Sequence, residues 1–172
     1  MRSASSPTSV PELYFLDAAR HDDQSERMRE HEAAGRCIFC PEHVAEFQTQ
    51  PVEFTGEHWY YKRNDWPYAG TVAHYLIVPV RHVVAFDELP DEAGAELWAI
   101  KRALKAKLAP LATATVERSG DMRLNGGSVA HLHVHFVALG PDPEKTVRFR
   151  VSARGARDSS ASAPAGRPGR PR

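Results

Sequence analysis

With 172 residues, the chain is long enough for one domain with a substantial buried core and too short for two ordinary domains. Its 22 basic and 22 acidic residues give a formal net charge of zero, which excludes a global basic field for nucleic-acid binding. The content of 42% hydrophobic and 26% charged residues is usual for a globular protein. No window approaches the roughly 18 to 20 consecutive apolar residues of a membrane span. We therefore expect one cytoplasmic domain without membrane contact.

The two ends of the chain differ from its middle in composition. Residues 1–20 are rich in Ser and Pro and have weak periodicity, which predicts a flexible N-terminal arm. Residues 151–172 consist mainly of Arg, Ser, Ala, Gly and Pro, which predicts a disordered basic tail. The arginines of this tail either contact nucleic acid or have no partner, and the composition favours the second reading. The folded domain is expected over residues 21–150.

Two helices are predicted. Residues 22–34 are rich in Glu, Arg, Gln and Ala and are followed by Gly35, a residue type favoured just after a helix. Between residues 90 and 108, apolar side chains recur every three or four positions, with Pro90 near the start and Pro110 beyond the end. This spacing predicts an amphipathic helix that packs one face against the rest of the domain.

Runs of β-branched and aromatic residues predict strands joined by turns. The expected strands are residues 57–62, 75–80, 113–117, 122–124 and 131–139, with 147–151 as a last edge strand. Strands outnumber helices and their connections are short. The fold class predicted is therefore α+β, an antiparallel sheet with one main amphipathic helix packed on a face and a short N-terminal helix.

The strand expected at residues 131–139 carries three histidines. Because side chains alternate between the two faces of a strand, His131, His133 and His135 project to one side. The opposite side, which begins at Leu132, is apolar and matches the apolar stripe of the helix at residues 90–108. Histidine has no packing reason to recur at every second position of a strand, so this row predicts a chemical role.

Two chemistries use such a row of histidines. Three neutral imidazoles can hold a catalytic metal ion that activates a water, or imidazoles can act as a nucleophile and as proton donors at a phosphate. Directly before the strand lies the segment Asn125-Gly126-Gly127-Ser128-Val129-Ala130. Its glycines permit close approach of backbone N–H groups to an anion, and its serine supplies a hydroxyl donor. This neighbour favours the phosphate interpretation.

The two cysteines of the chain, Cys37 and Cys40, are spaced Cys-x-x-Cys. In a reducing cytosol they are expected to remain thiols that are available to a metal, and a structural disulfide is not expected. The alternative is a pair of buried cysteines without a ligand, which behave as small apolar residues.

The histidine strand resembles the signature of the histidine triad (HIT) superfamily of nucleotide hydrolases and transferases. The segment His131-Leu132-His133-Val134-His135-Phe136-Val137 follows the pattern His-φ-His-φ-His-φ-φ, where φ is apolar. Upstream, Pro67-Tyr68-Ala69-Gly70 and the strand from His74 to His82 are similar to a second family segment. The resemblance covers roughly residues 37–139 and implies a HIT-like sheet and action on nucleotides.

The resemblance implies roles for several residues. His133 would attack the α-phosphorus of an AMP-type substrate, a phosphoramidate or a dinucleoside polyphosphate, to give a nucleotidyl-histidine intermediate. His135 and His74 would stand against the α-phosphate oxygens, and Ser128 would donate to a phosphate or to the leaving group. The nucleotide would also be held by the side chain of Asn64 at the ribose and by backbone N–H groups around Gly127.

Further implications concern a metal ion and a partner. Similar bacterial and archaeal members use the Cys-x-x-Cys pair with two histidines to hold a structural zinc. The matching residues here are Cys37, Cys40, His82 and His131. Two thiolates and two imidazoles form a closed tetrahedral shell without an open position for a catalytic water. A homodimer is implied as well.

Two other functions remain open at this point. One is a metal-dependent hydrolase in which all three histidines of the triad bind one ion. The other is a nucleotide-binding module that does not turn its ligand over.

Overall fold

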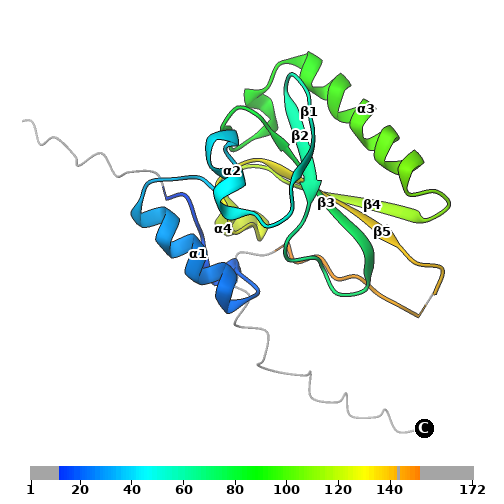
Figure 1. The fold of residues 1–172 in the computed structure, drawn as a ribbon, viewed down its shortest axis with the longest axis horizontal. Coiled ribbons are helices and arrows are strands. Elements are labelled where there is room, and N and C mark those ends of the chain that lie inside the picture. Colours follow the sequence, from blue (N-terminus) through cyan, green and yellow to red (C-terminus); the bar gives the residue numbers. More distant parts are fainter. Residues whose placement is uncertain (1–11, 143, 152–172) are drawn as a thin grey trace, which may run out of the picture.

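The computed structural model describes residues 12–142 and 144–151. Most of the expected N-terminal arm, residues 1–11, and nearly all of the expected basic tail, residues 152–172, lie outside the described residues. The described part contains one antiparallel sheet with strand order β1-β2-β3-β5-β4 (Figure 1). The strands are β1 (Val52–Thr55), β2 (Trp59–Arg63), β3 (Thr71–Pro79), β4 (Ala112–Arg118) and β5 (His133–Leu139). The helices are α1 (Asp22–Ala33), α2 (Pro41–Phe47), α3 (Asp91–Lys107) and α4 (Met122–Asn125), with short 3₁₀ turns at Leu16–Ala18 and Phe86–Glu88.

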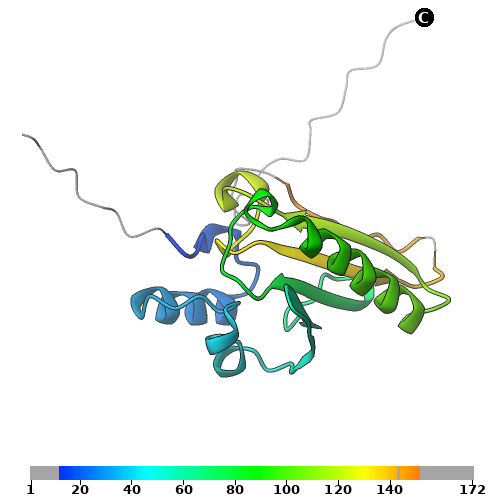
Figure 2. The same cartoon turned by 90° about the horizontal axis from the view of Figure 1, so that it is seen from above.

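The sheet has a core on each face, and the α+β class is confirmed. On one face, the apolar side of β5 packs against α3, where Leu132 and Val134 join Ile100 and Leu104 in one buried cluster. On the other face, α1, α2 and the chain before them cover the sheet, and Met28 and Val44 are buried with Leu76. Figure 2 shows α3 on one side of the sheet and α1 and α2 on the other. The histidine side of β5 therefore faces the α1 and α2 side.

The described part of the N-terminal segment lies directly against the domain. Tyr14 is 1% exposed and forms an isolated antiparallel bridge with Val129, in the loop that leads into β5. Its hydroxyl donates to the carbonyl of Arg36 at 2.5 Å and accepts from the Ile38 N–H at 2.9 Å. These contacts fasten the start of the described chain to the segment that carries the cysteines.

Two expected strands are wrong. Residues 122–124 begin the short helix α4, because the Asp121 carboxylate caps it by accepting from the Arg123 N–H, and Gly126 ends it with a φ of 75°. Residues 147–151 pair with no described strand, and residues 148–151 line the cavity on the histidine side of the sheet.

Strand β5 begins two residues later than expected. The N–H of Leu132 donates to the carbonyl of Val83 in the loop after β3, at 2.8 Å, and does not enter the sheet ladder. Strand β1 and helix α2 lie outside the predicted elements, since each is short and carries only a weak pattern. In the described residues, no helix has the length and apolar character that crossing a bilayer requires.

Candidate active site and metal cluster

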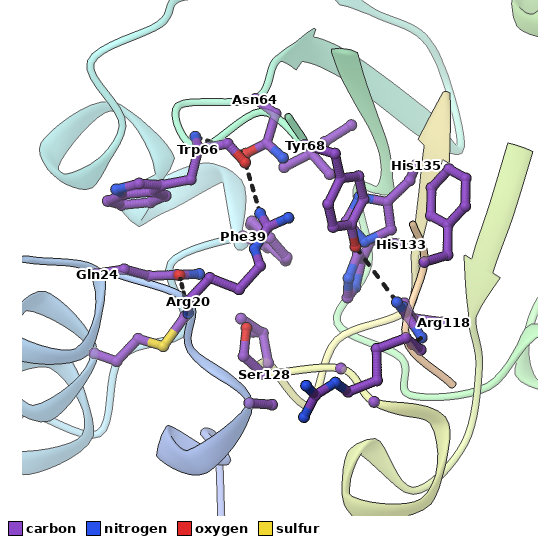
Figure 3. Close-up of a pocket in the computed structure, with 18 of the residues that line it drawn as sticks. Arg20, Gln24, Phe39, Asn64, Trp66, Tyr68, Arg118, Ser128, His133 and His135 are labelled. Atoms are coloured by element: carbon purple, nitrogen blue, oxygen red, sulfur yellow. Dashed lines mark hydrogen bonds between the residues drawn. The ribbon is translucent and has the colours of Figure 1, made fainter. Parts of the chain in front are cut away.

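A cavity of about 670 Å³ lies on the histidine side of the sheet. His133 and His135 reach it from β5, and Ser128 and Gly127 reach it from the loop before β5. Asn64, from the loop after β2, also lines it. Figure 3 shows the side chains of Asn64, Ser128, His133 and His135 around this cavity, together with those of Arg20, Trp66 and Tyr68. The fold thus brings together five of the residues that the sequence assigned to a nucleotide site.

His133 is held in one tautomer. Its Nδ1 lies 2.7 Å from the carbonyl oxygen of His131, and a carbonyl only accepts, so Nδ1 carries the proton and Nε2 keeps a lone pair. The ring is 4% exposed, and burial lowers its pKa to about 4, with the charge of Arg118 acting in the same direction. Near neutral pH the ring is therefore uncharged, and Nε2 is a free nucleophile.

His135 has the opposite tautomer, fixed through a chain of hydrogen bonds. The backbone N–H of Tyr68 donates to His74 Nδ1 at 3.1 Å, so His74 carries its proton on Nε2. That Nε2–H then donates to His135 Nδ1 at 2.9 Å. A neutral His135 consequently carries its proton on Nε2 and presents it as a donor to a partner in the cavity.

The imidazole rings of His74 and His135 both stay neutral near pH 7. Burial lowers the pKa of His74 to about 3, helped by the positive charge of Arg20. Burial also lowers the pKa of His135 well below its usual value, with His133 and His74 adding to the effect. His133 and His135 thus offer, side by side, one acceptor and one donor.

The structure places some predicted residues differently from the implied roles. His74 is 3% exposed, stacks on Tyr68 with ring centroids 4.9 Å apart, and does not line the cavity. It contacts His135 from behind. The N–H of Gly127 donates to Asn125 Oδ1 at 2.7 Å, so this group is already engaged in the described conformation.

The amide of Asn64 is also engaged. Its Oδ1 accepts from the Trp66 N–H at 3.1 Å, and its Nδ2 lies 3.2 Å from Nε2 and 3.3 Å from Nδ1 of the His74 ring. Asn64 therefore orders the loop that carries Trp66 and Tyr68 in addition to lining the cavity.

Sequence reasoning missed the arginines of this cavity. Arg20 lies in the segment expected to be a flexible arm, and Arg118 ends β4 with nothing in its neighbourhood that marks it as functional. Residues 148–151 of the C-terminal segment complete the lining. An arginine outside a known motif carries no local sequence signal of its function. Only the folded chain therefore reveals that these arginines line the cavity.

A second cluster lies beside the cavity and takes the first histidine of the triad. Its ligand atoms come from Cys37, Cys40, His82 and His131, and all lie within 4.8 Å of one another. Nδ1 of His131 is 3.4 Å from the sulfur of Cys37, and Nδ1 of His82 is 3.3 Å from the sulfur of Cys40. The Nε2 of His131 lies 3.1 Å from the carbonyl oxygen of Pro79, which fixes the proton on Nε2 and leaves Nδ1 for a metal.

The cluster fits a zinc ion by its chemistry and its size. Two sulfurs and two imidazole nitrogens are a common tetrahedral zinc set, and bonds of roughly 2.0 to 2.3 Å to a central ion place the ligand atoms about 3.5 Å apart. The hydrogen bond with Cys40 raises the pKa of His82, and the hydrogen bond with Cys37 together with burial raises the pKa of Cys40 to about 11.

Comparisons with known proteins agree with this architecture. The family model described as the HIT domain matches residues 48–141, which is more than half of the chain. A structure described as a zinc-bound histidine triad family protein from Mycobacterium smegmatis is 19% identical, with a TM-score of 0.52 over 68% of this chain and 84% of that one. A hypothetical protein from Leishmania major is 18% identical, with a TM-score of 0.51 over 74% of this chain and 90% of that one. The comparison with curated proteins found no match. The extent of the family match, together with the shared fold, shows that the chain belongs to the HIT domain family.

Proposed function

We propose that this protein is a nucleotide hydrolase or nucleotidyl transferase that acts at the α-phosphate of AMP-type substrates through His133. The observation that carries the proposal is the pair of opposite tautomers at the cavity. His133 offers a lone pair on Nε2, and His135 offers a proton on Nε2. A phosphoryl group between them meets a nucleophile and a hydrogen-bond donor at once.

The reaction would proceed in two displacements. The lone pair on His133 Nε2 attacks the α-phosphorus, and the bond to the leaving group breaks with its electron pair going to that group. The carbonyl of His131 stabilises the positive charge that develops on the ring, because it accepts the Nδ1–H. Water or an acceptor alcohol then attacks the phosphorus, loses its proton, and returns the electron pair to Nε2.

Other lining groups have positions that suit the rest of a nucleotide. Ser128 borders the cavity next to the triad, where its hydroxyl can donate to a phosphate oxygen or to the leaving group. Asn64 lies on the wall that Trp66 extends, which suits contacts to a ribose and stacking on a base. His74 would act indirectly, by fixing the tautomer of His135.

The test is capture of the covalent intermediate. The purified protein is mixed with a radiolabelled AMP amidate and then denatured at alkaline pH. We expect the label to be attached to His133, and mass spectrometry of the peptides would locate it. His133→Ala should lose the label and at least roughly 10³-fold in turnover, because the nucleophile is gone. His58→Ala, a histidine outside the cavity, is the matched control. Label that persists in His133→Ala would contradict the assignment.

We also propose that the Cys37, Cys40, His82 and His131 cluster holds a structural zinc. Support comes from the donor set and its spacing, and from the zinc-bound description of the relative from Mycobacterium smegmatis. A catalytic ion shared by all three triad histidines is disfavoured. Such an ion would need His131 to turn away from Cys37 and to give up the carbonyl of Pro79.

A further inference from the structure

The charge on the cavity wall is of one sign. Among the described residues that line it, the side chains that can carry a positive charge are histidines and arginines, and no Asp or Glu is present. Yet the whole chain has as many acidic as basic residues. A cavity lined by guanidinium groups without carboxylates attracts anions, because low-dielectric walls concentrate the field of its charges.

Arg118 is the most unusual of these groups. It is 3% exposed, and its described hydrogen-bond partners are all uncharged. Its Nη1 donates to the carbonyls of Asn125 and Arg150, the latter at 2.5 Å, and its Nη2 lies 3.4 Å from the hydroxyl of Tyr68. The buried Nε–H has no hydrogen-bond partner among the described residues. Buried arginines are normally paired with an acid, so this one has an unneutralised charge and an unused donor.

Arg20 approaches the same tyrosine from another direction. Its guanidinium lies over the ring of Tyr68, 4.0 Å from the centroid, and its Nη2 donates to the carbonyl of Trp66 at 2.6 Å. No carboxylate of the described chain forms an ion pair with Arg20 or with Arg118. Figure 3 shows both side chains directed toward Tyr68, which itself lies beside His135. Two cations are thus held within reach of the proposed reaction centre.

One phosphate does not account for this much positive charge. The α-phosphate of a phosphoramidate has one negative charge and leaves behind an amine that needs no anion site. In the proposed function, His135 and Ser128, which both line the cavity, already serve such a group. Two guanidinium groups beyond them match the additional charge of a second phosphate, for which arginine supplies paired N–H donors.

We propose that Arg118 and Arg20 form a second anion subsite, which binds the phosphate of the leaving group and makes nucleotide anhydrides the preferred substrates over amidates. The inference rests on the proposed function. When His133 forms its bond to the α-phosphorus, the bond between that phosphorus and the bridging oxygen breaks. The electron pair goes to the bridging oxygen, which departs as part of a phosphate. The arginines neutralise the charge that this oxygen gains, so the departing phosphate leaves without needing a proton.

The experiment compares two substrates and three arginine variants in the full chain. The substrates are a dinucleoside triphosphate and an adenosine phosphoramidate. Arg118→Gln and Arg20→Gln should each lower kcat/KM for the triphosphate roughly 10- to 100-fold more than kcat/KM for the amidate, the usual effect of losing a hydrogen bond from a charged group. Arg102→Gln, on the exposed part of α3, should affect neither substrate. Equal losses on both substrates, or no loss on the triphosphate, would overturn the subsite.

A binding measurement separates this inference from the proposed function. Calorimetry with inorganic pyrophosphate requires no turnover and should show binding to wild type that weakens in Arg20→Gln. That variant is the primary one, since Arg20 lies at the surface and its loss leaves the core intact, whereas Arg118 is buried. If His133 is labelled by the amidate but pyrophosphate binds both proteins equally, the subsite fails and the proposed function stands. If pyrophosphate binding weakens while no substrate labels His133, the subsite stands and the proposed function fails.

Discussion

Single atoms, more than charges, distinguish the histidines of this protein. His131, His133 and His135 are of one residue type and lie close together, yet each ring makes its hydrogen bonds to a different group. A carbonyl fixes the proton of His133 on Nδ1, and a neighbouring ring fixes that of His135 on Nε2. His131 has its proton held by Pro79, so that its Nδ1 faces the cysteines. The role of each ring follows from the backbone group or side chain that holds its other nitrogen.

The hydrogen-bond network of these histidines can be tested through His74, by measuring how the free energy of unfolding depends on pH. It is buried among His135, His133 and Arg20, and its pKa in the folded protein is about 3, against a usual value near 6.5. As pH falls below about 6.5, the unfolded chain binds a proton that the folded protein does not. The free energy of unfolding should therefore decrease by roughly 1.4 kcal/mol per pH unit for this group.

The measurement is urea unfolding at several pH values between 7 and 4, for wild type and His74→Gln. The variant lacks this titration, so its stability should fall less steeply than that of wild type over this interval. Parallel curves for the two proteins would show that His74 is not held neutral by its surroundings.

Among the elements, α3 and β5 were the most predictable. The period of apolar residues in residues 90–108 and the alternation in residues 131–139 are local properties, and they predicted the faces by which these two elements pack together. The structure joins these two faces, with Leu104 of α3 and Leu132 before β5 in one cluster. The strand predicted for residues 122–124 was wrong because a capping aspartate and a following glycine outweigh strand propensity in so short a segment.

The same packing predicts how α3 responds to substitution. Leu104 is fully buried, so Leu104→Ala should lower the free energy of unfolding by about 2 to 5 kcal/mol through lost burial and a cavity. Trp98 lies on the same helix with 65% of its surface exposed, and Trp98→Ala should change stability by less than about 0.5 kcal/mol. Chemical denaturation measures both. A similar loss in the two variants would contradict the packing of α3 by this face.

Over the whole molecule, the proposed zinc would connect parts that are distant in sequence. The cysteines precede α2, His82 follows β3, and His131 immediately precedes β5. Such a crosslink ties the α1 and α2 side to the sheet beside the cavity. Because the ligands are assembled only in the folded chain, metal binding adds directly to folding stability.

Removal of zinc should therefore lower stability. With zinc at 100 to 1,000 times its dissociation constant, mass action stabilises the folded protein by roughly 3 to 4 kcal/mol. A chelator should abolish this stabilisation, and the loss should be measured as a fall in Tm. Without any chelator, Cys40→Ser should already have the Tm of the chelated wild type. Elemental analysis should find no stoichiometric zinc in this variant. His43→Asn, a histidine near Cys40 but outside the cluster, should retain the metal. If the chelator shifts the Tm of Cys40→Ser as much as that of wild type, the metal lies elsewhere.

The sequence by itself determined which faces of α3 and β5 pack together, and it predicted the chemical type of the site. Alternation along β5 and the Cys-x-x-Cys spacing are local patterns, and they sufficed to predict a histidine face and a metal pair. Only the tertiary structure decided which groups meet. Cys37 and His131 are 94 residues apart in sequence, and their contact depends on how the loops before α2 and β5 are anchored. The arginine lining was decided in the same way, because a side chain's partner is set by long-range packing that no local period encodes.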